Sequence, residues 1–114
     1  MNQKTFVRHH RRRWKLTPAE LAQLVGTSHE IISRCEAVVS RIDLEVALGL
    51  QVVLGLSPRA LFPRLYRRVE DAVMRRAAEF EDSIRGRHDH IAKRQRRLLA
   101  AMTLRATNNP PAAA

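Results

Sequence analysis

The chain has 114 residues and a formal net charge of +10, and 45% of its residues are hydrophobic. This length accommodates one domain with at most a small appendage. No apolar run approaches the roughly 18 residues that a membrane helix requires, and the first residues lack the apolar stretch of a secretory signal. A single cysteine excludes an internal disulfide and a zinc site built from several cysteines, and it suits a reducing compartment. We therefore expect a cytoplasmic protein without a membrane segment.

The positive charge is concentrated towards the two ends of the chain. Residues 1–16 carry six Lys or Arg and no acid, and residues 63–114 carry twelve Lys or Arg against six acids. Residues 17–62 carry three Arg against five acids, so the middle of the chain is slightly acidic. A basic chain suits a polyanion such as nucleic acid. Here the flanks must supply much of that attraction.

Scarce glycine and the lack of segments that alternate apolar with polar residues predict an all-α fold. The first helix is expected over residues 2–13, with its basic side chains facing solvent. The side chains at helical spacings that are expected to face the core are Phe6, Val7, His10 and Trp14. The pair His9 and His10 does not indicate a metal site, because neighbouring helical residues point in different directions.

A capping box predicts a second helix over residues 18–25. Thr17 can cap this helix, Pro18 suits its first turn, and Glu20 lies at the third position after the cap. Gly26 can end the helix in the left-handed conformation, which only glycine enters without a side-chain penalty.

A third helix is predicted over residues 29–37, with Ser28 as its cap. Ile32 and Cys35 give it an apolar inner face, so Cys35 is interpreted as a core residue rather than a redox switch. Two short helices joined by a glycine-containing turn form a helix-turn-helix, whose second helix can enter a DNA major groove. Many αα-hairpins bury similar faces without touching DNA, so the pattern alone leaves both interpretations open.

A fourth helix is expected over residues 44–54, capped by Asp43 and ended by Gly55. The residues expected to supply its core atoms are Leu44, Ala47, Leu48, Val52 and Leu54. Ser57 starts a short fifth helix, and the bundle is closed by Leu61 and Phe62.

Residues 63–106 form a long amphipathic segment. Its apolar stripe must be covered by the chain's own core, a sister helix or a partner subunit, and we assign it to dimerisation. The dimerisation residues are Leu65, Val69, Val73, Phe80, Ile84 and Ile91. Gly86 marks a break or a kink, and Asp89 caps a final helix that ends near Arg105. One continuous helix and a hairpin broken at Gly86 both remain open, and residues 107–114 are expected to be a disordered tail.

A set of residues spread over about half of the chain follows one known pattern. These residues are Leu16, Thr17, Glu20, Leu21, Ala22, Gly26, Ser28, Ile32, Ser33, Arg34, Glu36, Leu44, Glu45, Leu54, Gly55, Leu61 and Phe62. Through them the segment from Val7 to Phe62 resembles the Xre family of helix-turn-helix regulators, the Cro and phage-repressor type.

The resemblance implies a five-helix lambda-repressor-like helix-turn-helix bundle over residues 1–62, followed by one or two long C-terminal helices in a dimerisation segment over residues 63–106. It also implies a bacterial or phage transcriptional regulator that binds double-stranded DNA sequence-specifically, as a repressor or a mobile-element or phage-type regulator. Such a protein acts as a homodimer on an inverted repeat and is nucleoid-associated when bound to DNA.

By the same resemblance, the positions that usually read bases correspond to His29, Glu30 and Arg34. Arg34 can bind guanine with two hydrogen bonds, and Glu30 can accept from a cytosine amine. Ile31 can cover a thymine methyl group, so it joins the predicted base contacts. The alternative for each of these side chains is a solvated surface residue.

Phosphate contacts are predicted from hydroxyl and basic side chains, and they are Thr17, Ser28, Ser33, Arg8, Arg12 and Arg41. Ser28 and Ser33 are aided by the positive ends of the helices. Many members of the family carry glutamine where Pro18 stands, and proline offers neither an N–H group nor a polar side chain. The basic N-terminal segment can replace this missing anchor.

The resemblance further implies that Arg11 pairs with Glu36 and fixes the first helix against the third. The chain departs from the family pattern at Lys15, which replaces the glycine usual before Leu16, so that turn must be made differently or with some strain. It also departs in the loop of residues 37–42, where Val38 and Ile42 replace the usual glycine and proline.

A second function from another class also fits the sequence. The C-terminal helices could form a protein-interaction module, as in an antitoxin-like or polymerase-binding partner. An enzyme is not expected, because the chain offers no nucleophile with a plausible base, no paired carboxylates and no phosphate-binding glycine loop. We expect no cofactor and no metal.

Overall fold

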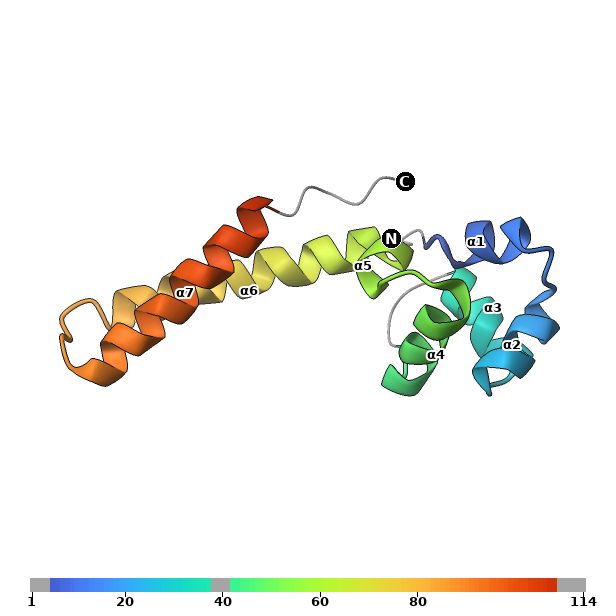
Figure 1. Ribbon diagram of the computed structural model, residues 1–114, viewed down its shortest axis with the longest axis horizontal. Coiled ribbons are helices and arrows are strands. Elements are labelled where there is room, and N and C mark those ends of the chain that lie inside the picture. Colours follow the sequence, from blue (N-terminus) through green and yellow to red (C-terminus); the bar gives the residue numbers. More distant parts are fainter. Residues whose placement is uncertain (1–4, 38–41, 109–114) are drawn as a thin grey trace. The chain divides into compact units, whose positions relative to one another are not determined.

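A computed structural model describes residues 5–37 and 42–108 (Figure 1). Within these residues the chain forms seven α-helices and no strand, which confirms the expected all-α class. The helices are Val7–Arg13 (α1), Pro18–Val25 (α2), His29–Ala37 (α3), Leu44–Leu54 (α4), Pro58–Leu61 (α5), Pro63–Ser83 (α6) and His90–Asn108 (α7). The chain divides into two compact units, and the boundary between them follows Tyr66.

The first helix is shorter than expected. α1 begins at Val7, and the backbone N–H of Phe6 donates instead to the carbonyl oxygen of Leu61 at 2.9 Å. The start predicted within residues 2–4 lies outside the described residues. At the other end the helix stops at Arg13, and the Trp14 side chain is 63% exposed. The prediction that Trp14 faces the core is wrong, because the chain has already left the helical path there.

The turn after α1 is strained, which is one of the two outcomes that the sequence left open. Lys15 has a φ of 60°, in the left-handed region where a side chain is unfavourable. The backbone N–H of Lys15 donates to Arg12, and that of Leu16 donates to Arg11, so the turn is closed by local hydrogen bonds. These bonds hold a conformation that glycine would adopt at lower cost.

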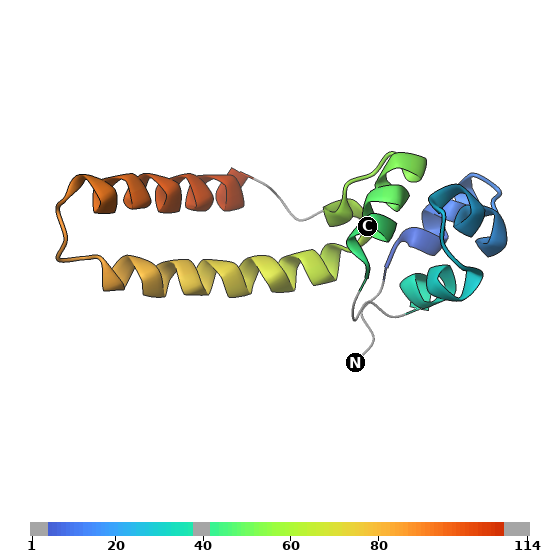
Figure 2. The same ribbon diagram turned by 90° about the horizontal axis from the view of Figure 1, so that it is seen from below.

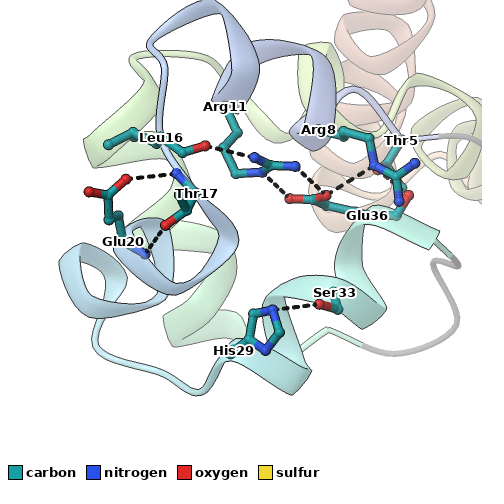
Figure 3. Close-up of polar contacts among 9 residues, drawn as sticks. All are labelled: Thr5, Arg8, Arg11, Leu16, Thr17, Glu20, His29, Ser33 and Glu36. Atoms are coloured by element: carbon teal, nitrogen blue, oxygen red, sulfur yellow. Dashed lines mark hydrogen bonds and ion pairs between the residues drawn. The ribbon is translucent and has the colours of Figure 1, made fainter.

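α2 has the predicted bounds and the predicted capping box. Thr17 accepts from the Glu20 backbone N–H at 3.1 Å, and the Thr17 N–H donates to the Glu20 carboxylate at 2.8 Å (Figure 3). Gly26 ends the helix at a φ of 88°, as expected for a left-handed stop. The backbone N–H groups of Gly26 and Thr27 both donate to Ala22, so the turn to α3 is compact.

α4 buries a different face from the one predicted. Val46, Leu50 and Leu54 are buried, whereas Leu44, Leu48 and Val52 are exposed, Val52 to 81%. The predicted core role is therefore wrong for Leu44, Leu48 and Val52 and right for Leu54. α4 has apolar residues on more than one side, so helical spacing alone was compatible with two different buried stripes.

The close approach of α2 and α4 explains which stripe of α4 is inside. A Cβ atom at Gly49 would lie 2.8 Å from Cγ1 of Val25, so the glycine lets the two helices come together. Gly49 shares its side of α4 with Val46, Leu50 and Val53 by helical spacing.

One apolar core holds the first unit together. Its buried residues come from α1 to α5 and the residue after α5, and they are Val7, Leu21, Ala22, Ile32, Cys35, Val46, Leu50, Leu54, Leu61 and Phe62. Leu65, at the start of α6, packs against this core. Its assignment to dimerisation is therefore corrected, because its apolar surface is used within the first unit.

The second unit is a helical hairpin. α6 and α7 run antiparallel, joined by a connection that contains Gly86 (Figure 2). This confirms the predicted break and decides for the hairpin over one continuous helix. Ala77, Ile84 and Leu99 form a small buried cluster between the helices. The guanidinium of Arg96 donates to the carbonyl oxygen of Ile84 at 2.8 Å, which ties α7 to the end of α6.

α7 ends later than predicted. It continues to Asn108, so Thr107 and Asn108 belong to a helix rather than to the predicted tail, and the rest of that tail lies outside the described residues. Among the described residues, no helix has both the length and the apolar character needed to span a membrane.

Candidate nucleic-acid interface

α3 presents one polar, exposed side and one buried side. Ile32, Cys35 and Glu36 are buried. The predicted base contacts all lie on the exposed side, and they are His29, Glu30, Ile31 and Arg34. Three of the four start the helix, where backbone N–H groups also point outward. The structure therefore gathers these side chains on one accessible surface, which we call the α3 outer face.

A buried ion pair fixes the rotation of α3. The Nε atom of Arg11 donates to Glu36 Oε2 at 2.7 Å, and its Nη2 atom donates to Oε1 at 3.2 Å (Figure 3). Its Nη1 atom donates to the Leu16 carbonyl oxygen at 2.6 Å. One arginine thus links α1, α3 and the turn between α1 and α2.

Two further contacts to Glu36 were not expected from the sequence. The Nε atom of Arg8 donates to Glu36 Oε1 at 3.1 Å, and the Thr5 hydroxyl donates to the Glu36 backbone carbonyl at 3.3 Å. Arg8 was predicted to contact phosphate from a solvent-facing position, but part of its guanidinium is used here. The helical spacing of Arg8 and Arg11 could have revealed this, because they are three residues apart and share a side of α1.

The hydroxyl side chains near α3 have local partners. The Ser28 oxygen accepts from the Ile31 backbone N–H at 3.2 Å, which caps α3 as predicted and leaves the Ser28 hydroxyl hydrogen for another acceptor. Ser33 lies 3.5 Å from His29 Nε2, so these two side chains can orient one another on the α3 outer face. Both arrangements are compatible with a nearby phosphate.

Thr17 is less suited to bind phosphate than the sequence indicated. Its backbone N–H already donates to Glu20, whose carboxylate therefore sits at the start of α2. A phosphate at that helix end would meet this negative charge. Arg12 is exposed and remains a candidate, and Arg41 lies outside the described residues.

Burial changes the pKa of two groups in the first unit. Burial raises the pKa of the Cys35 thiol, with a further contribution from the negative charge of Glu36. Burial also lowers the pKa of His10, and the charges of His9 and Arg13 act in the same direction. The thiol is therefore protonated and shielded, as expected for a core residue. In the described part of the chain, no three His, Cys, Asp or Glu side chains are grouped to hold a metal ion.

The predicted dimerisation residues of the second unit divide into two sets. Val69, Val73, Phe80 and Ile91 keep exposed apolar surface, whereas Ile84 is buried inside the hairpin. Ile84 is therefore removed from the residues that could contact a partner. Leu98 is also exposed and lies seven residues after Ile91 on α7.

Comparison with family models, with curated proteins and with solved structures found no match to this chain.

Proposed function

We propose that this chain is a transcriptional regulator of the Xre type that binds double-stranded DNA sequence-specifically, with α2 and α3 as a helix-turn-helix. The observation that carries the proposal is the α3 outer face. Its polar side chains are exposed at the start of a short helix, while Glu36 and the apolar side of α3 are fixed to α1 and the core. A reading helix must be held rigidly and yet present its first turns to base edges.

The side chains of this face suit the major groove. Arg34 offers the planar donor pair that matches guanine O6 and N7, and Glu30 offers an acceptor for a cytosine amine. Ile31 offers an apolar surface for a thymine methyl group, and the His29 ring can donate or accept depending on its tautomer. These four residues are the proposed base contacts.

The charge distribution is compatible with DNA binding. Residues 1–62 carry nine Lys or Arg against five acids, and one of those acids, Glu36, is buried against Arg11 and Arg8. Among the predicted phosphate contacts, we propose Arg12, on α1, and Ser28, at the start of α3. We further propose that the regulator is a homodimer on an inverted repeat, because one helix-turn-helix touches few base pairs.

A second candidate function is supported by a different observation. Leu44, Leu48 and Val52 form an exposed apolar stripe on α4, at four-residue steps. Apolar surfaces of this kind often mark protein contacts. A protein-interaction module, antitoxin-like or polymerase-binding, would use this stripe or the C-terminal hairpin.

Selection of bound sequences from random duplex DNA tests the proposal. We expect one enriched motif containing a repeated half-site, with affinity that falls steeply as salt rises. A matched scrambled duplex is the control for nonspecific attraction by a basic chain. Equal binding to the enriched and scrambled duplexes would refute sequence-specific regulation and favour the protein-interaction module.

A further inference from the structure

Trp14 is the only tryptophan of the chain, and it lies in water just after the end of α1. Its indole N–H, which can donate a hydrogen bond but not accept one, has no acceptor among the described residues. Between Thr5 and Gln23 it is the only large hydrophobic residue that is exposed. A single exposed aromatic side chain needs no explanation by itself, so its surroundings decide whether it has a role.

The turn that carries Trp14 is tied to the core of the first unit. The backbone N–H groups of Trp14 and Leu16 both donate to the carbonyl oxygen of Arg11, at 3.1 and 3.2 Å. The Arg11 guanidinium in turn donates to the Leu16 carbonyl oxygen at 2.6 Å, and it is held by the buried Glu36 carboxylate (Figure 3). A surface that is held in this way loses little conformational freedom when it binds a partner.

Lys15, next to Trp14, has a strained backbone. Its φ of 60° lies in the left-handed region, and its N–H donates to the Arg12 carbonyl oxygen at 3.0 Å. Strain of this kind persists where the surrounding structure enforces it, and it is concentrated at binding sites. The strained residue lies beside the exposed indole, so we looked for charged groups around both.

Four consecutive exposed residues form a basic patch at this turn. We call them the turn patch, and they are Arg12, Arg13, Trp14 and Lys15. In the part of the chain that the structure describes, the three cations of the patch have no ion-pair partner, whereas Arg8 and Arg11 bind Glu36. The positive charge of the turn patch is therefore available to a partner.

Little negative charge lies near the turn patch along the chain. Glu20 is the only acid among the first 29 residues, and its carboxylate already accepts from the Thr17 N–H. On the α1 side, burial lowers the pKa of His10, and the positive charges of His9 and Arg13 lower it further. Positive charge thus accumulates around the turn, which suits a polyanion.

The length of α2 relates the turn patch to the groove that α3 would enter. In a helix-turn-helix the start of the second helix contacts base edges, while the first helix crosses the DNA backbone. The end of α2 joins α3 through the compact turn at Gly26, so this end of α2 would lie nearest the groove. α2 has eight residues and is about 12 Å long, which matches the width of the major groove. The other end of α2, which the turn patch precedes, would therefore reach the phosphates that border the groove.

The composition of the turn patch fits a nucleic-acid backbone better than a membrane surface. A segment that lies in a membrane interface buries a whole apolar face. The turn patch offers one large apolar side chain, Trp14, among three cations. One ring with a hydrogen-bond donor, flanked by positive charge, matches a sugar and the phosphate attached to it.

We propose that the turn patch binds the sugar–phosphate backbone of duplex DNA, beside the groove that α3 reads. The Trp14 indole N–H donates to a phosphate oxygen, the ring packs against the adjacent sugar, and Lys15 and Arg13 contribute charge. The contact does not depend on sequence, because phosphates and sugars are the same at every base pair. It rests on the proposed DNA-binding function and gives Trp14 and Lys15 a part in it.

The fluorescence of the full chain tests this contact, because Trp14 is its only tryptophan. We expect the selected duplex, at a fixed protein concentration, to shift the emission to shorter wavelength and to reduce quenching by acrylamide. A scrambled duplex at low salt should do the same, since low salt strengthens contacts with phosphate. The matched control is Leu104→Trp in a Trp14→Phe background. Its tryptophan lies on α7 at a similarly exposed position, 61% against 63%, and should remain fully quenched.

Substitutions of Trp14 test its contribution to affinity. Trp14→Ala should weaken binding to the selected and the scrambled duplex by the same factor, about tenfold, because a hydrogen bond to a charged phosphate is lost. Trp14→Phe keeps a ring and loses the N–H donor, so its affinities should fall between those of the wild type and Trp14→Ala. Circular dichroism should show unchanged unfolding, because Trp14 is mostly exposed. A loss confined to the selected duplex, or wild-type affinity in Trp14→Ala, would overturn the proposal.

The outcomes also separate the turn contact from the proposed function. A protein that selects a motif while Trp14 stays freely quenched on that duplex would reject the turn contact and leave the function standing. Protection of Trp14 by both duplexes, without any selected motif, would support the turn contact and reject sequence-specific regulation. Protection by vesicles of equal parts phosphatidylserine and phosphatidylcholine, and not by duplex DNA, would overturn the proposal in favour of a membrane surface.

Discussion

Arg11 and Glu36 lie 25 residues apart and form a two-point ion pair, with distances of 2.7 Å and 3.2 Å. Both side chains are buried: 8% of the Arg11 side-chain surface and 3% of the Glu36 side-chain surface is exposed. The remaining Arg11 nitrogen donates to the Leu16 carbonyl, which leads into α2. The α3 outer face is therefore oriented by a buried ion pair: loss of Arg11 would leave the buried Glu36 carboxylate with the half-exposed Arg8 as its charged partner.

Replacing Arg11 by alanine should lower the free energy of unfolding by about 3–5 kcal/mol, because the Glu36 carboxylate would stay buried with much of its compensation lost. Urea unfolding followed by circular dichroism measures this loss. Arg8→Ala is the matched control: its side chain is half-exposed, so the expected cost is at most about 1 kcal/mol.

The double variant Arg11→Met/Glu36→Leu distinguishes the loss of the ion pair from the cost of leaving one charge buried. It should be clearly more stable than Arg11→Ala, because no buried charge remains. A double variant as unstable as the single one would mean that shape or the Leu16 contact, and not charge, dominates at this site.

Lys15→Gly should raise the free energy of unfolding by about 1 kcal/mol. Lys15 has a φ of 60°, a conformation that costs a residue with a side chain about 1–2 kcal/mol. Glycine avoids this cost, but its unfolded chain has more conformational freedom to lose on folding, which offsets part of the stabilisation. Thermal or urea unfolding measures the change. Lys15→Ala keeps the Cβ atom and should show no such gain, so equal stabilisation by both variants would trace the effect to the lysine side chain rather than to the backbone.

Cys35 should react slowly with alkylating reagents in the folded protein. Burial raises the pKa of its thiol, so less thiolate forms than at an exposed cysteine at the same pH. Because the folded pKa is the higher one, the thiol favours folding fully below its ordinary pKa of about 8.5, and that contribution is lost as pH rises above it. Labelling rates with and without urea between pH 7 and 9 test the first point. Equal rates in both would show that the thiol is accessible.

Neutralising Arg12 and Arg13 should flatten the salt dependence of DNA binding. Each phosphate contact that is lost removes about 0.9 from the slope of log K against log salt concentration. Binding of the selected duplex by Arg12→Gln/Arg13→Gln, over a series of salt concentrations, measures the slope. Arg97→Gln/Arg105→Gln, on α7, removes the same two charges and is the control for net charge alone. An unchanged slope in the double variant would place both arginines away from DNA.

The caps and turns of the first unit could be predicted from the sequence because they depend on a few neighbouring residues. Thr17 with Glu20, and Gly26 at its left-handed position, are decided by local backbone chemistry. The strain at Lys15 follows in the same way, from a side chain in a turn that favours glycine.

The face that α4 buries could not be predicted, because it depends on a distant neighbour. The helix offers two apolar stripes, and the close approach of Gly49 to Val25 selects the stripe that contains Leu50. The same limit applies to Ile84, whose burial depends on where α7 folds back. Trp14 was misplaced because helical spacing was applied to a residue that lies just beyond the end of α1 at Arg13.

In the candidate site, the residues of the α3 outer face could be predicted from helical spacing once Ile32 and Cys35 were assigned to the core. The Arg8 contact with Glu36 did not, since it requires α1 and α3 to be placed side by side. Arg8 is thereby shifted from a DNA contact towards a structural role.

Arg34→Ala should weaken binding to the selected duplex by about 1–3 kcal/mol and leave binding to a scrambled duplex nearly unchanged. The reason is that two hydrogen bonds to one guanine carry sequence information, whereas phosphate contacts do not. Arg34→Lys is the sharper variant, because it keeps the charge and loses the planar donor pair. It should lose nearly as much discrimination as Arg34→Ala, with the two affinities measured by fluorescence anisotropy at a fixed salt concentration. Full discrimination in Arg34→Lys, or equal losses on both duplexes in Arg34→Ala, would show that Arg34 supplies only charge and would move the base-reading role to His29 and Glu30.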